Sequence, residues 1–159
     1  MGYVKGSVSA SEVLSGIPTW SWNAKDNDPV FVDITGTWQI EAPPFGIEFR
    51  LNNEGVAANQ NDEVELGIVR FPKAASYTMY LTVYKGTSEG IAHPMLDGVD
   101  VGGLFDLYDG SGVNIVTLSA SLGAQAVGIK LIGLKVASKN ASSGGYRLNI
   151  YSVIIVPTL

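Results

Sequence analysis

The stretch SYTMYLTVY, residues 76–84, decides the fold class of this chain. Apolar side chains recur at every second position, at Tyr77, Met79, Leu81 and Val83, and Thr and Tyr alternate between them. A period of two is the pattern of a β-strand with one buried face, because successive side chains point to opposite sides of the strand. The second face, Thr-Tyr-Thr-Tyr, is either a contact surface or a solvated face whose rings lean on neighbouring strands.

Short segments of the same kind follow one another along the chain, with turn residues between them. The dipeptide Asp97-Gly98 favours a tight hairpin. No helical spacing extends beyond a turn or two, so the pattern predicts an all-β sandwich or jelly roll. The expected strands are residues 30–34, 37–41, 46–51, 63–71, 76–84, 90–96, 99–101, 113–119, 126–137 and 146–156.

Two long apolar runs change phase partway along. In residues 126–137 the apolar positions are odd up to Leu131 and even from Ile132. Residues 146–156 change phase in the same way around Ser152. A β-bulge in each run would keep both sets of side chains facing inward. Burial of the strand on both faces is the alternative.

The length and composition predict one globular domain. A chain of 159 residues with 46% hydrophobic residues can bury a single core, and 16% charged residues leave a weakly charged surface. Residues 1–27 show no sustained period and contain Gly, Ser and Pro18. We therefore expect an irregular N-terminal arm over 1–27 and one jelly-roll β-sandwich domain over 28–159.

Charge and cysteine content exclude several classes of partner. The net charge is −5 and the basic residues are scattered, so no basic stripe exists to bind nucleic acid. The chain has no cysteine and therefore no disulfide framework, which suits folding in a reducing cytoplasm. No apolar run reaches the roughly 18 residues of a membrane span, and the first residues contain no secretory signal. We expect neither a nucleic-acid nor a membrane partner.

The residues that usually carry catalysis do not form a recognisable set. His93 is the only histidine, so no Ser-His-Asp triad or His-ligated metal cluster can form. Asp97, Asp100, Asp106 and Asp109 are close enough in sequence to supply a glycosidase pair. Aspartate is also favoured in such turns because its side chain caps them, and we adopt that interpretation. The sequence predicts no catalytic residue, and the protein is not expected to be an enzyme.

Two oxygen-rich loops, residues 26–28 and 59–63, are alternative sites for a structural Ca²⁺ ion. Neither has the spacing of an EF-hand, and the ordinary polarity of loops explains both. We expect no metal site and no cofactor, with structural Ca²⁺ kept as the alternative.

A set of aromatic residues provides the one candidate ligand site. Aromatic faces stack on sugar rings because they combine an apolar surface with a wet rim. Aromatics in a β domain also serve as core or as subunit interface, and the sequence leaves these alternatives open. The candidate residues are Trp20, Trp22, Trp38, Tyr80 and Tyr84.

The second half of the chain resembles the jelly-roll, galactose-binding-like modules that are related to carbohydrate-binding domains. The residues that carry this resemblance are YTMYLTVYKG (77–86), GIAHPMLDGVDVG (90–102), LYDG (107–110) and GIKLIGLKVASKNASSGGYRLNIYSVIIVP (128–157). The closing segment, in which KNASS joins two strands, is also similar to virion proteins of tailed bacteriophages. The same fold serves sugar binding, receptor binding and structural roles.

With its leading arm and no shaft repeats, the chain most resembles a capsid decoration, or cement, protein. That resemblance implies a non-enzymatic virion protein, folded in the host cytoplasm and placed on the capsid surface. It further implies a homotrimer that binds the major capsid protein and bridges its subunits, with multivalency strengthening weak contacts. The alternative is a carbohydrate-binding or host-receptor-binding module of a phage tail fibre, for which a glycan is the partner.

Overall fold

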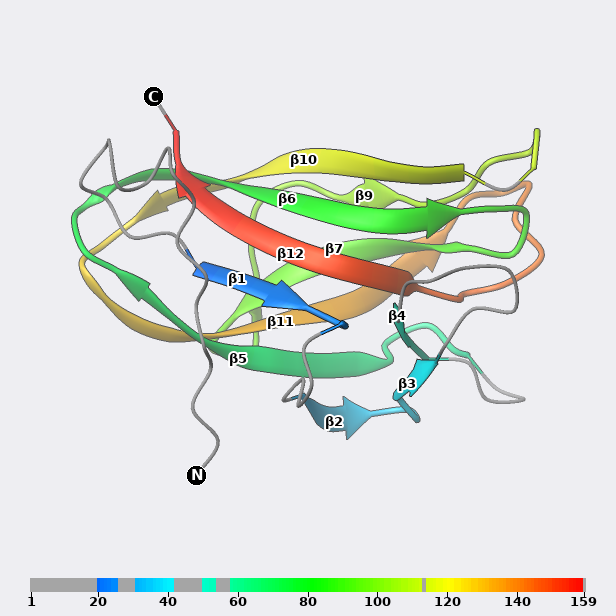
Figure 1. Cartoon of the computed structure of the whole chain (residues 1–159), viewed down its shortest axis with the longest axis horizontal. Coiled ribbons are helices and arrows are strands. Elements are labelled where there is room, and N and C mark those ends of the chain that lie inside the picture. The colour runs from blue at the N-terminus through cyan, green and yellow to red at the C-terminus, as the bar shows by residue number, and fades with distance from the viewer. Residues whose placement is uncertain (1–19, 26–30, 42–49, 54–57, 113, 159) are drawn as a thin grey trace.

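The computed structural model describes residues 20–25, 31–41, 50–53, 58–112 and 114–158. These residues form two six-stranded sheets that lie face to face (Figure 1). Every pairing between named strands is antiparallel. The predicted all-β sandwich is confirmed. The described residues include no helix, and thus none long and apolar enough to cross a membrane.

The first sheet, sheet A, has the strand order β10-β6-β12-β4-β3, and β1 pairs with β12. The strand β12 therefore lies at the centre of the sheet, beside β6 and β1 (Figure 1). The bounds of its strands are β1 (Trp20–Asn23), β3 (Gln39–Glu41), β4 (Arg50–Asn52), β6 (Ala75–Lys85), β10 (Asn114–Gln125) and β12 (Asn149–Pro157).

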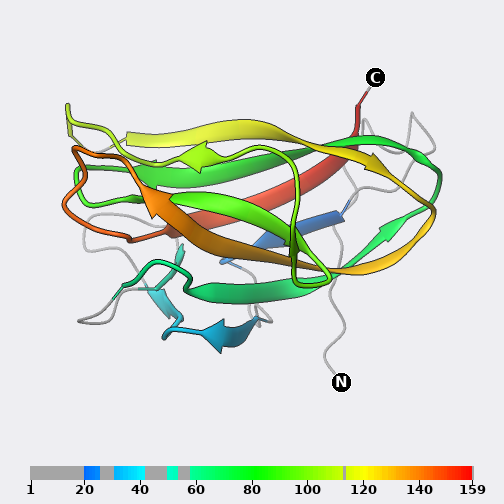
Figure 2. The same ribbon diagram turned by 180° about the vertical axis from the view of Figure 1, so that it is seen from behind.

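The second sheet, sheet B, has the order β2-β5-β11-β7-β8, and β9 pairs with β7. Figure 2 shows this sheet from behind, with β11 between β5 and β7. The bounds of its strands are β2 (Val32–Thr35), β5 (Glu63–Phe71), β7 (Gly90–Leu96), β8 (Val99–Asp100), β9 (Phe105–Asp106) and β11 (Gly128–Lys139).

The core fills the space between the sheets, and β6 supplies it as the sequence predicts. Tyr77, Met79, Leu81 and Val83 are at most 2% exposed, whereas the residues between them are half-buried or exposed. From sheet B, alternate residues of β11, among them Leu134, meet them in the same cluster. Burying each large aliphatic side chain stabilises the fold by about 1.5–3 kcal/mol, and this burial holds the sheets together.

The phase change in residues 146–156 arises as predicted. The pairing of β12 with β6 shifts register between Ile150 and Ser152, and the shift keeps Leu148, Ile150, Val153 and Ile155 in the core. The bulge lets one strand change phase without exposing either set of side chains.

The phase change in residues 126–137 has a different origin, and the prediction that both sets face inward is wrong. Ile129 and Leu131 are 68% and 40% exposed, while Ile132 is buried. The register shift opposite Ile132 and Gly133 adds its extra residue to β5, at Leu66, and not to β11. The strand β11 keeps its alternation, so its first apolar residues lie on the outer face.

The predicted N-terminal arm, residues 1–27, contains one strand of the sandwich. Trp20 to Asn23 form β1, and Trp20 and Trp22 lie opposite Ile155 and Val153 of β12. Residues 1–19 and 26–27 lie outside the described residues. The alternation in WSWN, large apolar and then small polar, is that of a half-buried strand. This part of the segment is therefore built into sheet A, and its tryptophan rings are not exposed to a partner.

Polar side chains are buried where the loop between β11 and β12 meets the other loops at one end of the sandwich. Glu89 is 1% exposed, and its Oε2 accepts a hydrogen bond of 3.0 Å from Asn149 Nδ2. Ser143 Oγ donates to the Glu89 backbone oxygen at 2.7 Å. Asn53 Oδ1 accepts from Leu148 N at 2.8 Å. Because buried polar groups are costly unless they are paired, these bonds fix the pliable KNASSGGY loop on the body of the domain.

Candidate functional site

The outer side of sheet A carries the candidate site, which we call the hydroxyl face. It spans four neighbouring strands, β10, β6, β12 and β1, and none of the residues that compose it is charged. Its members are Ser76, Thr78, Tyr80, Thr82, Tyr84, Ile115, Thr117, Ser119, Ser121, Ser152, Ile154, Val156, Ser21 and Asn23.

Strand register brings these residues into rows across the sheet. One row consists of Ser119, Tyr80, Ile154 and Ser21, each opposite the next on the adjacent strand. The next row along the strands consists of Thr117, Thr82, Ser152 and Asn23. Residues directly opposite one another in an antiparallel sheet share a face and lie within side-chain contact. The face is therefore one surface, built from segments far apart in the chain.

Hydroxyl pairs join neighbouring strands across this surface. Thr82 Oγ1 and Thr117 Oγ1 lie 2.9 Å apart, and Thr78 Oγ1 and Thr158 Oγ1 are also 2.9 Å apart. A hydroxyl group has one proton and two lone pairs, so a bonded pair uses one proton and keeps the other available. Each pair can still donate to and accept from a ligand on the face.

Two tyrosines stand on this face of β6. Tyr80 is 40% exposed, between Ser119 and Ile154. Tyr84 is half-buried, and a Cβ added to Gly86 would lie 2.8 Å from its Cε1, so its ring lies against the Gly86 backbone. Four residues separate the tyrosines, a rise of about 13 Å along a strand. Tyr80 therefore offers the open ring, with Tyr84 further along the same line.

The chemistry of the hydroxyl face suits binding and not reaction. A serine or threonine hydroxyl becomes a nucleophile when an adjacent base takes its proton. No carboxylate or imidazole belongs to the residues that compose this face. Because the face has no charge, it is suited to a ligand that has none, and exposed Tyr80 and Ile154 add apolar area.

The structure separates the five aromatic residues predicted to bind a ligand. Trp20, Trp22 and Trp38 are 6%, 3% and 4% exposed and belong to the core. Trp38 Nε1 also donates to Thr35 O at 3.1 Å. For these tryptophans the structure matches the alternative of core packing that the sequence left open. Tyr80 and Tyr84 lie together on the hydroxyl face, so a stacking role remains a prediction for them.

The sequence did not reveal Thr117, Ser119, Ser152 and Ile154 as parts of the site. They come from β10 and β12, which are distant from β6 in sequence. A signal is present in NIVTLSAS, where Ile115, Thr117 and Ser119 alternate with apolar residues. Only the register of β10 and β12 on β6 shows that these residues adjoin Tyr80.

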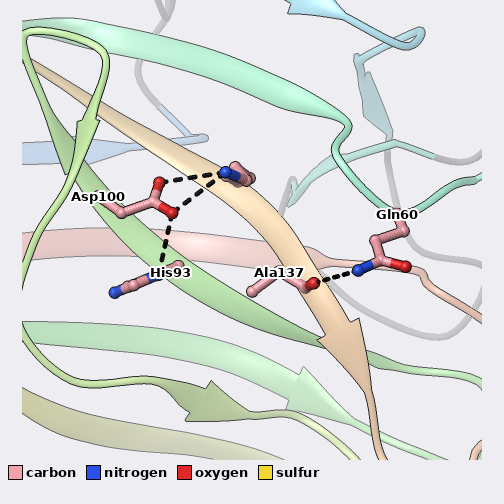
Figure 3. Close-up of polar contacts among 5 residues, drawn as sticks. Gln60, His93, Asp100 and Ala137 are labelled. Carbon is pink, nitrogen blue, oxygen red and sulfur yellow. Dashed lines mark hydrogen bonds and ion pairs between the residues drawn. The ribbon is translucent and has the colours of Figure 1, made fainter.

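His93, Asp100 and Asp106 lie on strands of sheet B, and Asp97 lies in the turn between β7 and β8, all away from the hydroxyl face. His93 is half-buried on β7, and its Nδ1 is 3.5 Å from Asp100 Oδ2 (Figure 3). Lys135 Nζ lies 3.1 Å from the same Asp100 oxygen. In the turn of the same hairpin, Lys130 Nζ and Leu131 N donate to the carboxylate of Asp97 at 2.8 and 2.9 Å. Asp97 and Asp100 are thus engaged by residues of β7 and β11, and these bonds do not cap their own turn as the sequence predicts.

Asp106 and Asp109 each accept a bond from the backbone N–H two residues further along, which is the turn capping that the sequence predicts. Asp106 accepts from Tyr108 N and from Asn140 Nδ2, both at 2.9 Å. Asp109 Oδ1 accepts from Ser111 N and Oγ at 2.9 and 2.6 Å. The hydrogen bonds from Ser111 lower the pKa of Asp109 below its ordinary value. A raised pKa would mark a general acid, so Asp109 is not tuned for that role.

In the loop at residues 59–63, a candidate for Ca²⁺, the side chains of Asp62 and Gln60 form hydrogen bonds with other groups of the protein. Asp62 is 3% exposed, and its Oδ2 accepts from Asn53 Nδ2 at 3.0 Å and Asn59 N at 2.9 Å. Gln60 Nε2 donates to Ala137 O at 2.8 Å (Figure 3). The loop at residues 26–28 lies outside the described residues. Elsewhere in the described ranges, no three of His, Asp and Glu gather as a metal site.

Several solved structures with a similar fold are carbohydrate-binding modules. The chain matches no protein-family model and no curated protein. It is similar to the C-terminal family 6 module of a laminarinase from Zobellia galactanivorans, with a TM-score of 0.59 and 20% identity over 87% of this chain and 98% of that one. A family 6 module of a lichenase from Cellvibrio mixtus, in complex with cellotriose, has a TM-score of 0.58 and 14% identity over 87% of this chain and 97% of that one.

A third similar structure is a family 36 module of a multidomain xylanase from the hindgut metagenome of Trinervitermes trinervoides. Its TM-score is 0.58 and its identity 16%, over 89% of this chain and 98% of that one. These likenesses establish that the chain has the jelly-roll β-sandwich fold of carbohydrate-binding modules. The predicted fold class is confirmed.

Proposed function

We propose that this protein is a non-enzymatic carbohydrate-binding module that binds an uncharged glycan on the hydroxyl face of sheet A. The observation that carries the proposal is an exposed tyrosine, Tyr80, set among Ser and Thr hydroxyls on a surface without charge. The alternative function predicted from the sequence, glycan binding, is thus preferred to capsid decoration.

The binding would use two kinds of contact. A sugar ring has apolar C–H faces that stack on an aromatic ring, and Tyr80 offers such a ring at 40% exposure. The hydroxyls around a sugar both donate and accept, as do Thr82, Thr117 and Ser119 beside Tyr80. A neutral ligand also avoids the cost of removing water from a charge. A linear chain that lies along β6 would extend from Tyr80 toward Tyr84.

The fold neighbours support this class of ligand. All three are described as carbohydrate-binding modules, and one of them holds cellotriose, a neutral trisaccharide. The fold alone does not select a function, because the same sandwich serves many roles. The chemistry of this chain's own face supports glycan binding, and the neighbours support the same class of ligand.

The test is a binding measurement with cellotriose and a panel of neutral plant and algal polysaccharides. Tyr80→Ala should weaken binding about thirtyfold, because removal of a central aromatic contact typically costs about 2 kcal/mol. Thr82→Lys should also weaken it, since the lysine places a charge in the middle of the face. His93→Ala, on sheet B, is the matched control and should bind as the parent does. Binding that survives both changes on sheet A, or that is confined to acidic glycans, would refute the proposal.

Capsid decoration remains a second candidate. The observation that favours it is that the uncharged face, with Ile115 and Ile154 at 54% and 41% exposure, also suits burial against a protein. The homotrimer, the major capsid protein as partner and the location on the virion all remain predictions. Mixing the protein with undecorated phage heads and measuring co-sedimentation tests them. Stoichiometric binding to heads, with no affinity for any glycan, would reverse the order of the two candidates.

A further inference from the structure

The strand β10 forms an unusually long open edge. It has 12 residues and pairs on one side only, with β6. The other edge strands among the described residues are short: β1 and β2 have 4 residues, β3 has 3, and β8 and β9 have 2. Short edges limit pairing with other chains, whereas a long one is a template for a further strand.

Two hydrogen bonds show which backbone groups of β10 face outward. Gly103 N, from the loop before β9, donates to Ser121 O at 3.1 Å, so the carbonyl of Ser121 points away from β6. On the other side of β6, Thr158 N donates to Ser76 O at 2.8 Å, so the backbone carbonyl of Ser76 points toward β12. The backbone groups of the even-numbered residues of β6 therefore bond to β12, and those of the odd-numbered residues bond to β10. Since N–H and C=O of a strand residue point to one side, both bonds agree.

It follows that the N–H and C=O groups of Ile115, Thr117 and Ser119 face the open edge. Each lies opposite an even residue of β6 in the register. No backbone hydrogen bond within the described ranges reaches these three residues on the outward side. The free stretch ends at Ser121, whose carbonyl Gly103 already occupies.

This edge lacks the usual protection against pairing. Natural edge strands carry Lys, Pro or an inward charge to prevent association. The sequence of β10, NIVTLSASLGAQ, contains none of these. Its inner side carries Val116 and Leu118, which are only half-buried against the core. A strand added beside β10 would cover them.

We propose that two copies of this chain associate through β10, antiparallel and edge to edge, about a two-fold axis at Thr117. With Thr117 opposite Thr117 of the second copy, Ile115 faces Ser119 and all three residues can both donate and accept across the axis. A register centred on Leu118 would place Ile115 opposite Ser121. The Ser121 carbonyl already accepts a hydrogen bond from Gly103 N, so that pair could not form both of its bonds. The Thr117 register also places Val116 beside Leu118 of the second copy. An uncharged strand meets its own copy without repulsion.

The pairing joins the two copies into one continuous sheet. A two-fold axis perpendicular to a sheet keeps the same face of both strands on the same side. The two hydroxyl faces would therefore form one surface of twice the width. Two linked sites raise the effective affinity for a polymer that can reach both. The pairing itself does not depend on what the face binds.

The experiment follows the oligomeric state by sedimentation velocity up to about 1 mM protein, a range that detects even weak association. The parent should shift from monomer to dimer with concentration. Thr117→Pro should stay monomeric yet folded, because its missing N–H faces the open edge and not β6. Thr117→Val keeps the N–H and is the matched control, which should dimerise as the parent does.

Single cysteines test the register without relying on proline. The chain has no cysteine, so each introduced one reports only on its own position. Thr117→Cys should form a disulfide dimer under mild oxidation, because opposed Cα atoms lie about 5.5 Å apart, within the range for a disulfide. Ala124→Cys, on the same strand, should not, since its two copies would lie roughly 46 Å apart. A parent that stays monomeric or forms a trimer would overturn the proposal, and so would equal cross-linking of the Thr117→Cys and Ala124→Cys variants.

Discussion

The two outer faces of the sandwich lie on opposite sides of one molecule and differ in chemistry. On sheet B, Lys135 stands between Glu63 and His93 of the adjacent strands, and it pairs with Asp100 at 3.1 Å. On sheet A, the corresponding rows contain only hydroxyl, amide, aromatic and aliphatic side chains. On sheet B the charged side chains of Lys135 and Asp100 pair with each other, whereas the hydroxyl face of sheet A contains no charged residue.

This difference shows which face is better prepared for a ligand. A ligand on sheet B would compete with ion pairs and turn bonds that hold adjacent strands and the Asp97 hairpin. A ligand on sheet A only displaces water, because the hydroxyls there still have a donor or acceptor position that no protein group uses. Sheet B also exposes Ile68 and Leu131 opposite each other, at 55% and 40%, beside its charges. The three tests below sharpen or break this contrast.

The largest effect is expected inside sheet A. Leu81→Ala should lower the free energy of unfolding by about 2–5 kcal/mol, because Leu81 is fully buried and a cavity would remain. Tyr80→Ala, the next residue but on the hydroxyl face, should cost less than about 1 kcal/mol, since surface substitutions seldom cost more. Urea unfolding measures both values. Equal costs would show that the outer ring supports the fold, and would weaken its assignment to ligand binding.

A smaller difference between the two outer faces should appear in how the stability of their variants depends on salt concentration. Asp100→Asn removes the partner of Lys135 and should cost at most about 1 kcal/mol, less at high ionic strength, because exposed ion pairs are screened. Thr82→Val removes the bond to Thr117 and should cost about 1 kcal/mol at any salt concentration. Unfolding in low and in high NaCl compares the two. A salt-dependent loss at Thr82 would contradict the absence of charge on the hydroxyl face.

The smallest effect concerns Asp97 and pH. The hydrogen bond from Lys130, followed by that from Leu131 N, holds the pKa of Asp97 below its ordinary value of 3.8. A lowered pKa in the folded state gives stabilisation that is present above 3.8 and lost as pH falls through the folded pKa. Asp97→Asn keeps the left-handed turn geometry at φ 53° but removes this dependence. Melting temperatures of parent and variant should converge toward pH 2, and a gap that widens in acid would contradict it.

Local alternation was enough to predict the fold class, and it failed where packing depends on a partner strand. The pattern of 76–84 indicates an inside and an outside, and β6 has both as expected. The run 126–137 shows a phase change but not its cause, because the extra residue belongs to β5. WSWN has the alternation of a strand, but its pairing partner β12 is more than a hundred residues away in the sequence.

The candidate site was only partly predictable for the same reason. Tyr80 and Tyr84 follow from the alternation of one strand. Their neighbours Ser119 and Ile154 depend on the register of three strands, which no local pattern fixes. The tryptophans show a second limit, since the sequence predicts an irregular arm over residues 1–27 and no strand at Trp20 and Trp22. The structure places both on a strand beside β12, with their rings in the core.

The position of β12 has a consequence for synthesis. This last strand contacts β6, β4 and β1, and it separates strands that come much earlier in the chain. During translation, β1 and β4 have no place in sheet A until residues 149–157 have left the ribosome. Until then, Met79 and Leu81 of β6 lack the neighbour that completes their sheet. A nascent chain stalled before β12 would expose part of its core and would be a target for chaperones. The chaperone would be released once β12 had paired with β6, β4 and β1 and completed sheet A.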